Sequence, residues 1–256
     1  MHAAEREAAI FQLLGDSGFV SFRELERRLD ASPATIRRDL ERLASEGRVV
    51  RVHGGAKLPA EQGASGSLTG VPFHQNINLN RAAKEAIGKA AAELCHPGDG
   101  IIIDGGSTTL QMCPHLDGLG LQVLTNSLHI VSALLPQPTT RITVPGGAVF
   151  REQNIILSAA GEDLMPRFHA PKLFMGAAAV GPQGIMQADI VLVAAERRFI
   201  ERAEEVIVLV DSSKFEGPSG HVVCGLDEID IVVTDGAISR EHRRMITDAG
   251  ARVVVA

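Results

Sequence analysis

The side chains best suited to bind an extended anion are the arginines of one short segment, SPATIRRDLERLASEGRVVRVHGG, residues 32–55. Ile36, Leu40 and Leu43 follow helical spacing there and predict a buried stripe along one side of a helix. Arginines on the other side can form paired hydrogen bonds with guanine edges or bind phosphate, and small residues at the helix start allow close approach to bases. We therefore assign DNA contacts to Ser32, Ala34, Thr35, Arg37, Arg38 and Arg42 on this helix, and to Arg48, Arg51 and His53 beyond it. The competing interpretation is a solvent-exposed face on which the arginines pair with neighbouring acidic residues.

Two further helices and a pair of strands are expected to hold this helix in place. Apolar residues recur at helical spacing over residues 3–15, and Ser21, three residues before Glu24, predicts a capping box for a second short helix. Pro33 suits the first position of the third helix. The run RVVRV predicts a strand and the HGGA after it a turn. Three helices and a β-hairpin make a winged helix-turn-helix, whose recognition helix enters the major groove of duplex DNA.

A second group of residues suited to bind an anion follows the apolar run GIIID, residues 100–104. Two glycines and then three hydroxyl residues lead from this run into a predicted helix, so backbone N–H groups and hydroxyls can hold a phosphate or carboxylate. The spacing is neither GxGxxG nor a P-loop, so neither a dinucleotide nor a nucleoside triphosphate is indicated. The alternative is that these residues serve only the turn and the helix cap.

Similar polar residues follow other predicted strands, in TNS (125–127), PGG (145–147) and DSSK (211–214). Ligands of open α/β sheets bind beyond the carboxyl ends of the strands, so these residues are expected to meet there. Lys214 can neutralise a phosphate or carboxylate in such a crevice; without its companions it would be an ordinary loop lysine.

Near-continuous apolar runs alternate with helical patterns over most of the chain. Strands are expected at 100–104, 121–125, 141–147, 172–180, 206–211, 230–235 and 251–256, and helices at 81–95, 107–116, 126–135, 188–203 and 239–249. Such runs are typical of a parallel sheet buried on both faces. We expect an α/β fold, with a parallel-rich sheet and helices on both faces, preceded by a small winged helix-turn-helix domain. The expected boundaries are 1–57 for the DNA-binding domain, 58–72 for a Gly-, Ser- and Pro-rich linker, and 73–256 for the α/β domain.

Charge and composition limit the class of protein. The chain has a net charge of −6, yet residues 33–57 hold six basic residues against three acidic ones, which indicates one local anion-binding surface on an acidic body. No apolar run approaches the roughly 20 residues that cross a bilayer, and the charged N-terminus is unlike a signal peptide, so we expect a cytoplasmic protein. Cys95, Cys113 and Cys224 have the spacing of neither a disulfide framework nor a zinc site, and we expect no metal and no cofactor.

Taken in order, TIRRDL…RVHGGA and DGGSTT…TNS…GG…DSSK…TD resemble the DeoR family of bacterial transcriptional repressors over nearly the whole chain. The resemblance implies an N-terminal winged helix-turn-helix and a C-terminal sensor similar in fold to ribose-5-phosphate isomerase. It also implies repression of a carbohydrate catabolic operon, with a phosphorylated sugar or sugar derivative as effector. On that basis we assign effector binding to Asp104, Gly105, Gly106, Ser107, Thr108, Thr109, Asn126, Gly146, Gly147 and Lys214. We expect a homo-oligomer, a dimer or tetramer, because paired DNA-reading helices match repeated half-sites of double-stranded operator DNA.

Two departures from the family pattern concern the effector. Gln75 and Asn76 stand where members often have an Arg ahead of a Lys, which is kept here as Lys84, and Arg197 and Arg198 stand where a Lys is common. The segment IILSAAGE, residues 155–162, resembles the ascorbate-utilisation repressor, which implies a sugar-acid phosphate. The sequence leaves open which phosphorylated sugar or sugar acid is bound.

The alternative function is a sugar-phosphate isomerase-like enzyme fused to a DNA-binding module. Isomerase proton transfer needs a carboxylate base beside the reacting carbon. The isomerase motif that the fold resembles is Asp-Gly-Ala-Asp, whereas TDGAIS keeps Asp235 and has Ile238 at the second acid. An aliphatic side chain cannot transfer a proton, so we expect no catalytic residue and no enzyme. An activator or dual regulator is equally compatible with the sequence, because the sign of regulation depends on where the operator lies.

Overall fold

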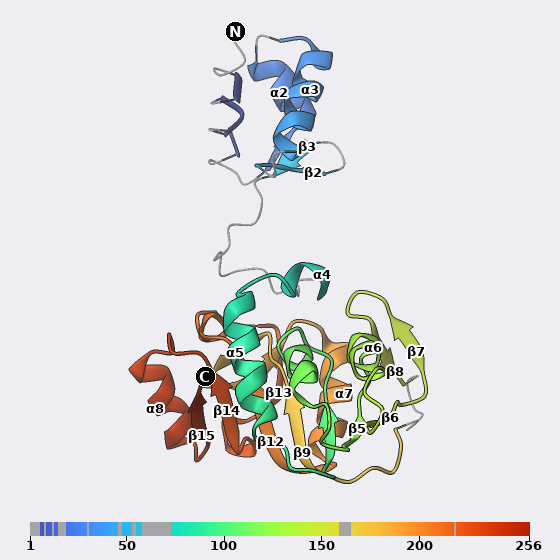
Figure 1. The fold of residues 1–256 in the computed structure, drawn as a ribbon. Helices are drawn as coiled ribbons and strands as arrows, with labels where there is room; N and C mark the ends of the chain where they lie inside the picture. Colours follow the sequence, from blue (N-terminus) through green and yellow to red (C-terminus); the bar gives the residue numbers. More distant parts are fainter. Residues whose placement is uncertain are drawn as a thin grey trace. The chain divides into compact units, whose positions relative to one another are not determined.

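The computed structural model divides into two compact units, residues 1–64 and 65–256, and each is considered by itself (Figure 1). It describes residues 6–7, 9–11, 13–14, 19–29, 31–45, 48–52, 55–57, 73–158, 165–217 and 219–256. The division between the units falls inside the segment 58–72 that the sequence predicts to be a linker.

The first unit has the helices and strands of a winged helix. Its described residues between 6 and 14 are helical, and β1 (Phe19–Ser21), α2 (Phe22–Arg28), α3 (Pro33–Ser45), β2 (Val50–Val52) and β3 (Gly55–Lys57) follow. The strands form an antiparallel sheet in the order β1-β3-β2. The β2–β3 hairpin is the predicted wing, whereas β1 is a third strand that the sequence did not predict.

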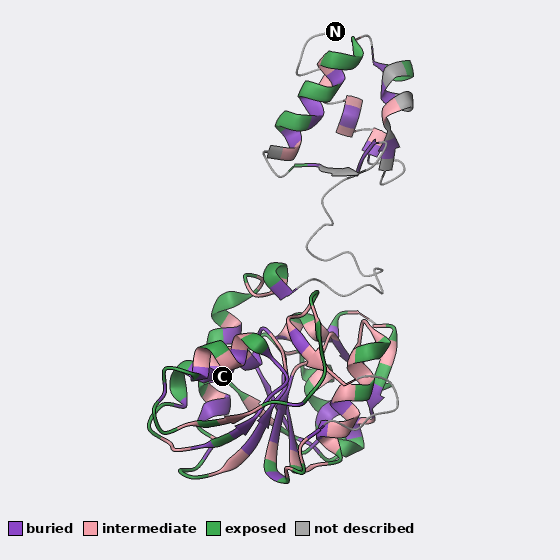
Figure 2. Cartoon of the chain, turned by 90° about the vertical axis from the view of Figure 1, so that its right-hand side faces the viewer, coloured by how far each residue is buried: buried purple, intermediate pink, exposed green. Residues whose placement is uncertain are grey.

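A small apolar core holds α3 against the rest of this unit. Ile36, Leu40 and Leu43 are buried together with Leu25 of α2, as the helical spacing predicts. The opposite side of α3 is exposed, and Figure 2 shows this division along the helix. The core therefore fixes which side of α3 faces solvent.

The second unit is built on a seven-stranded sheet in the order β15-β14-β12-β9-β4-β5-β6. All six pairings between these strands are parallel. The strands are β4 (Gly100–Ile103), β5 (Gln122–Leu124), β6 (Arg141–Thr143), β9 (Ala170–Met175), β12 (Ala203–Leu209), β14 (Ile231–Thr234) and β15 (Arg252–Val255). Each falls on one of the seven predicted runs, so the expected parallel α/β architecture is confirmed.

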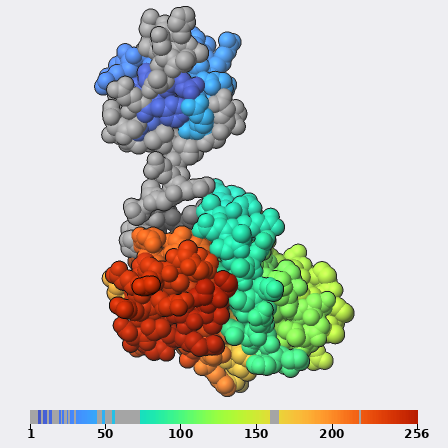
Figure 3. Space-filling model, turned by 60° about the vertical axis from the view of Figure 1, so that its left-hand side comes forward, coloured from blue at the N-terminus to red at the C-terminus, as the bar shows by residue number. Residues whose placement is uncertain are grey.

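Helices cover both faces of this sheet because successive strand residues point to opposite sides. Ile101 and Ile103 pack with α5 (Arg81–Ala92), η1 (Thr109–His115) and α6 (Leu128–Leu134). Ile102 packs instead with residues of α7 (Ile190–Ile200) and α8 (Arg240–Asp248). The purple strands of Figure 2 lie between these two layers, and Figure 3 shows α5, in teal, between the C-terminal segments in red and the green segments after β4.

Several elements depart from the predicted pattern. The predicted strand 172–180 ends at Met175, and Ala179 begins β10 (Ala179–Gly181), which joins β11 (Gly184–Gln187) and β13 (His221–Cys224) in a small antiparallel sheet. The predicted helix 107–116 is a 3-10 helix that begins at Thr109 and contains Pro114. Also unpredicted are the hairpin of β7 (Ala148–Phe150) and β8 (Ile155–Leu157), α4 (Phe73–Asn76), and the 3-10 helices η2 (Ser212–Phe215) and η3 (Leu226–Glu228). Among the described residues, no helix has the length and apolar character needed to cross a membrane.

Candidate functional site

The start of α3 has the geometry of a capped helix. The backbone N–H of Thr35 donates to the Ser32 hydroxyl at 3.2 Å, and the two hydroxyl oxygens lie 2.8 Å apart. Ser32 and Ala34 are exposed and Thr35 is half-buried, so the predicted small residues do lie on the surface at the start of the helix. This end of α3 is therefore fixed by its own side chains and open to a partner.

Four of the arginines assigned to DNA binding fall into two groups. Arg37 and Arg38 lie exposed on α3, with the Arg37 guanidinium 5.0 Å from the centre of the Phe22 ring. Arg42 and Arg48 are also exposed, but both contact the carboxylate of Glu7. Of the two remaining assigned residues, Arg51 lies in β2 and His53 lies outside the described residues.

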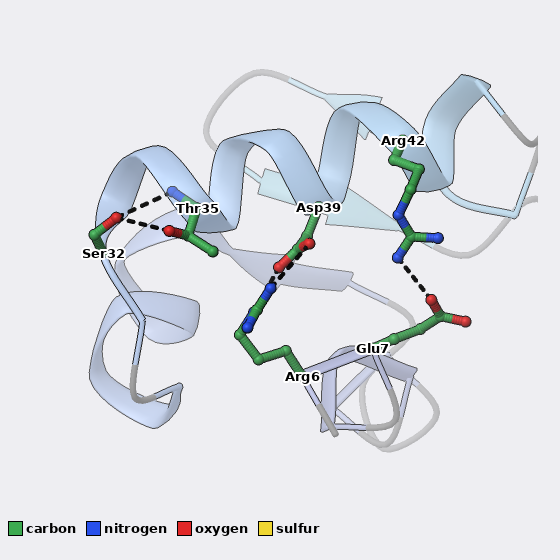
Figure 4. Close-up of polar contacts among 6 residues, drawn as sticks. All are labelled: Arg6, Glu7, Ser32, Thr35, Asp39 and Arg42. Atoms are coloured by element: carbon green, nitrogen blue, oxygen red, sulfur yellow. Dashed lines mark hydrogen bonds and ion pairs between the residues drawn. The ribbon is translucent and has the colours of Figure 1, made fainter. Parts of the chain in front are cut away.

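Ion pairs join the N-terminal helical residues to α3 (Figure 4). Arg6 Nε donates to Asp39 at 2.7 Å, and Arg42 donates to Glu7 at 2.7 Å. Hydrogen bonds from Arg42 and then Arg48 lower the pKa of the Glu7 carboxyl. The acidic residue that faces Arg42 therefore comes from a distant segment, and it stabilises the packing of the first helical residues on α3.

A cavity of about 400 Å³ lies at the carboxyl ends of the parallel strands in the second unit. Seven of the ten residues assigned to effector binding border it: Asp104, Gly105, Gly106, Ser107, Thr108, Asn126 and Lys214. They follow β4, β5 and β12, which are distant in sequence and meet at one edge of the sheet. The structure thus brings these seven residues together around one cavity.

Three assigned residues do not border this cavity. The Thr109 hydroxyl donates to the carbonyl oxygens of Asp104 and Gly106, at 2.8 and 3.0 Å, so it shapes the loop instead. Gly146 is exposed, and Gly147 has a φ of 148°, with a Cβ there lying 2.1 Å from the Leu157 carbonyl oxygen. Gly147 is therefore required by the close approach of two backbone segments.

The cavity also has a wall whose residues the sequence analysis did not assign to the site. The described residues of this wall come from α4, the β7–β8 hairpin and the loop after β9. The rest come from the end of β11, from α7 and the residues just before it, and from Ser219. They are Phe73, Asn76, Phe150, Glu152, Gln153, Ile155, Gly176, Ala177, Ala178, Gln187, Ala188, Asp189, Leu192, Ala195, Glu196 and Ser219. One signal was present: Leu192, Glu196 and Phe199 recur at i, i+4 and i+7, which puts a carboxyl group on the apolar stripe of a helix.

Asn126 holds the loop after β4. Its side-chain oxygen accepts the N–H of Gly105 at 3.2 Å, and its backbone oxygen accepts the N–H of Ile156 at 2.8 Å. The side chain is buried, and among the described residues its Nδ2 finds no hydrogen-bond acceptor. A buried donor without an acceptor is costly, so this N–H group is suited to bind a polar atom of a ligand.

Two buried carboxyl groups share the cavity. Burial raises the pKa of Asp104 to about 6, and burial together with the Asp104 carboxyl raises the pKa of Glu196 well above its usual value. Gln187 Nε2 donates to Glu196 Oε1 at 2.6 Å, whereas Glu196 Oε2 has no partner among the described residues. These groups can accept hydrogen bonds from hydroxyls, and a protonated one can also donate.

Lys214 lies on a short turn that is held by other side chains. Asp211 caps η2 by accepting the N–H of Ser213 at 3.2 Å, and it accepts a second hydrogen bond from Asn80 Nδ2 at 2.9 Å. Nearby, buried Lys84 donates to the Asn76 carbonyl oxygen at 2.5 Å. Burial and the charge of Lys214 lower the pKa of Lys84 to about 8. The cavity thus combines a loop rich in N–H groups and hydroxyls, one ammonium, and hydrogen-bonding carboxyl and amide groups.

Both units match domains of a known protein family. Residues 6–62 match the DeoR-like helix-turn-helix domain, and residues 79–236 match the DeoR C terminal sensor domain. The chain is 28% identical over 254 residues to the HTH-type transcriptional regulator UlaR of Shigella dysenteriae serotype 1 (strain Sd197), and likewise to that of Escherichia coli (strain K12 / DH10B). In both cases the match covers 99% of this chain and 99% of the relative.

Solved structures with partial similarity include the ribose 5-phosphate isomerase A of Methanocaldococcus jannaschii. It is 18% identical with a TM-score of 0.39, covering 53% of this chain and 55% of that one. eIF2B beta from Chaetomium thermophilum is 17% identical with a TM-score of 0.40, covering 59% of this chain and 48% of that one. The present chain thus spans about half the length of each of these proteins.

Proposed function

The chain belongs to the DeoR family, and from this we propose that it is a sequence-specific transcriptional repressor of a carbohydrate catabolic operon. A phosphorylated sugar or sugar acid is the effector that releases or modulates it. The observation that carries the proposal is that one chain matches the helix-turn-helix and the sensor domain of the family, in that order. Its relatives along the full length are named as transcriptional regulators.

In this proposal α3 is the helix that reads double-stranded operator DNA. Arg37 and Arg38 lie exposed on it, and the capped start of the helix presents Ser32 and Ala34. Exposed guanidinium groups on a recognition helix can bind base edges or phosphates in the major groove. Arg42 and Arg48 would contribute by exchanging the Glu7 carboxylate for phosphate groups.

The cavity at the carboxyl ends of the strands is the proposed effector site. Lys214 and the hydroxyls of Ser107 and Thr108 suit the phosphate group, since they supply one positive charge and hydrogen-bond donors. Asp104 and Asn126 suit the hydroxyls of the sugar. We further propose a cytoplasmic homo-oligomer, dimer or tetramer, which needs no cofactor besides this effector.

Binding assays with the chain's own promoter region and with random duplex of equal length test the DNA assignment. At physiological salt the promoter DNA should bind at least a hundredfold more tightly, because specific sites exceed non-specific ones by about 10³–10⁷. Arg37→Ala or Arg38→Ala should cost about 1–3 kcal/mol and relax sequence preference if the residue binds a base. Arg240→Ala, at an exposed position on α8 of the other unit, is the matched control. Equal binding to both duplexes would refute the proposal.

One observation favours the second candidate, a sugar-phosphate isomerase. Glu196 is a buried carboxyl group with a raised pKa beside Asp104, which is the kind of group that general acid–base catalysis uses. Against it, Asp235 of the isomerase-like motif is engaged by the N–H groups of Ser212 and Ala237. These bonds lower its pKa despite burial, and Ile238 packs on the apolar core. We therefore propose that the chain is not an enzyme; incubation with pentose and hexose phosphates should give no turnover.

A further inference from the structure

The ring of His129, in α6, contacts two elements that border the cavity. One face stacks on the Phe73 ring of α4, with the ring centres 4.2 Å apart and the planes 11° from parallel. At the ring edge, Nε2 lies 3.1 Å from Nδ2 of Asn154, in the turn between β7 and β8. A neutral imidazole has one acceptor nitrogen, so the Asn154 amide can donate to it. One side chain thus joins α4 to the β7–β8 hairpin.

The backbone fixes Asn154 in place for this contact. Its φ is 52°, in the left-handed region that asparagine adopts more readily than most residues. Its carbonyl oxygen accepts the N–H of Leu128, the neighbour of His129, at 3.0 Å, and a bridge joins Ser127 to Ile155. Figure 1 shows α6 beside the hairpin. The turn therefore presents the Asn154 side chain to the ring at a defined position.

The other described contacts of α4 tie it less directly to the hairpin. The Phe73 N–H donates to the Glu152 carbonyl at 3.4 Å, which is long for an N–H···O bond and therefore weak. Buried Lys84 donates to the carbonyl and side-chain oxygens of Asn76, at 2.5 and 3.1 Å, but it belongs to α5. An aromatic pair can shift an equilibrium roughly two- to twelvefold. The contacts of His129 are therefore the stronger tie between α4 and the hairpin.

His129 lies behind the cavity wall. Phe73 of α4 borders the cavity, and so do Phe150 and Ile155 of the hairpin. His129 is not among the described residues that line it. A molecule in the cavity can therefore contact both elements without touching His129. Changing this residue can alter how the two elements move together while the lining side chains stay the same.

We propose that His129 is the positioning residue that couples the β7–β8 side of the cavity to α4. The inference rests on the proposed function, in which a molecule bound in the cavity changes operator binding. Phe73 directly follows the segment 58–72 in sequence, so the arrangement of α4 sets the point at which the chain enters the second unit. A ligand that favours one position of the hairpin then favours one position of α4, because His129 joins the two.

The test measures binding and transmission separately on the full chain. Titration calorimetry with aldose, ketose and aldonic acid phosphates of four to six carbons identifies the tightest-binding probe. The coupling factor is the ratio of promoter affinities without and with a saturating amount of that probe, and the wild type should give about ten or more. His129→Leu removes both the ring and its nitrogen. It should keep probe affinity within about threefold and lower the coupling factor about fivefold or more.

Further variants separate the two contacts of the ring. His129→Phe keeps a ring against Phe73 and removes the acceptor for Asn154, so it should retain part of the coupling that His129→Leu loses. Asn154→Gly removes the amide and tolerates the positive φ, and it should lower coupling as His129→Phe does. Combining these two changes should lower it no further, because both delete the same hydrogen bond. His115→Leu, at an exposed position of η1 outside the cavity lining, is the matched control.

Hydrogen exchange gives a readout that a purely structural role would not move. In the wild type, the bound probe should slow amide exchange both in the hairpin and in the peptide that contains α4. In His129→Leu the hairpin should still be protected by the probe, whereas the protection of α4 should be lost. Thermal melting serves as the folding control for every variant.

The outcomes distinguish the inference from the proposed function. If His129→Leu leaves the coupling factor unchanged, or lowers it only in proportion to probe affinity, the inference is wrong and the effector site stands. If His129→Leu does not fold, the pair of His129→Phe and Asn154→Gly decides, and no loss of coupling or purely additive losses would overturn the inference. If no probe binds, or if bound probe leaves wild-type promoter affinity unchanged, the proposed function fails and the inference fails with it.

Discussion

Replacing Gly88 with alanine should destabilise the second unit, although the same change usually stabilises a helix. Gly88 is buried in α5, where a Cβ would lie 2.5 Å from the backbone carbon of Gln111 and 2.6 Å from its Cβ. Those atoms belong to η1, and backbone cannot rotate away as the end of a side chain can. Alanine therefore forces α5 and η1 apart.

The size of the effect follows from two opposing terms. Gly→Ala in a helix contributes about 0.5–1 kcal/mol of stability through lower backbone entropy. Overpacking a close contact costs about 1–3 kcal/mol. The expected net loss in the free energy of unfolding is about 1–2 kcal/mol. For a unit of this size such a loss lowers the melting temperature by about 2–8 °C.

The same substitution should weaken the effector response. Gln111 Nε2 donates to the Ser107 carbonyl at 3.2 Å, so moving Gln111 disturbs the loop proposed to hold the phosphate. Calorimetric unfolding and effector titration of Gly88→Ala measure both effects, with Lys89→Ala, an exposed position on the same helix, as control. A melting temperature equal to or above that of the wild type would show that the α5–η1 contact is not as close as the structure has it.

Three further substitutions test other parts of the structure. Ser32→Ala removes the hydroxyl that caps α3 at Thr35 and should cost the first unit about 1 kcal/mol in a denaturant titration; an unchanged midpoint would exclude that cap. Lys214→Met should leave promoter binding intact and abolish release by the effector, and normal release would remove Lys214 from the site. Asp104→Asn should gain stability relative to the wild type as pH rises from about 4 to 7. The reason is that a folded-state pKa of about 6, raised by burial, makes ionisation of Asp104 destabilising above its unfolded-state pKa. A shift of two pKa units corresponds to about 3 kcal/mol in the free energy of unfolding. A difference in stability between Asp104→Asn and the wild type that does not change with pH would contradict the raised pKa of Asp104.

The parallel sheet was predictable because its strands are buried on both faces. Residues 206–209 illustrate this: Val206 and Val208 pack into one core and Ile207 and Leu209 into the other, so every position is apolar. Two of the short strands outside that sheet, β1 and β10, carry no such signal. β1 has three residues, and β10 was read as the continuation of β9 because Gly176–Ala178 are as apolar as a strand.

The candidate site was predictable only where a loop has a distinctive composition. DGGSTT, TNS and DSSK each follow a strand, and the rule that ligands bind at strand ends brought them together. The opposite wall comes from α4, the β7–β8 hairpin and α7, which no local pattern connects to the strand ends. At Gly147 composition was misleading. The loop has the glycines expected of a ligand-binding loop, but the close approach of the Leu157 backbone explains why Gly147 is a glycine.

The position of α4 gives a physical reason why a ligand in the cavity can affect DNA binding. Phe73 and Asn76 of α4 border the cavity, and in sequence α4 follows the segment that connects the two units. Several contacts hold α4: the Phe73 ring stacks on His129 at 4.2 Å, the Phe73 N–H donates to the Glu152 carbonyl, and Lys84 donates to both the carbonyl and the side-chain oxygen of Asn76. Under the proposed function, an effector that touches these residues shifts the population of α4 arrangements only by its difference in affinity for them. If effector weakens operator binding as proposed, operator DNA must weaken effector binding by the same factor, because linkage is reciprocal.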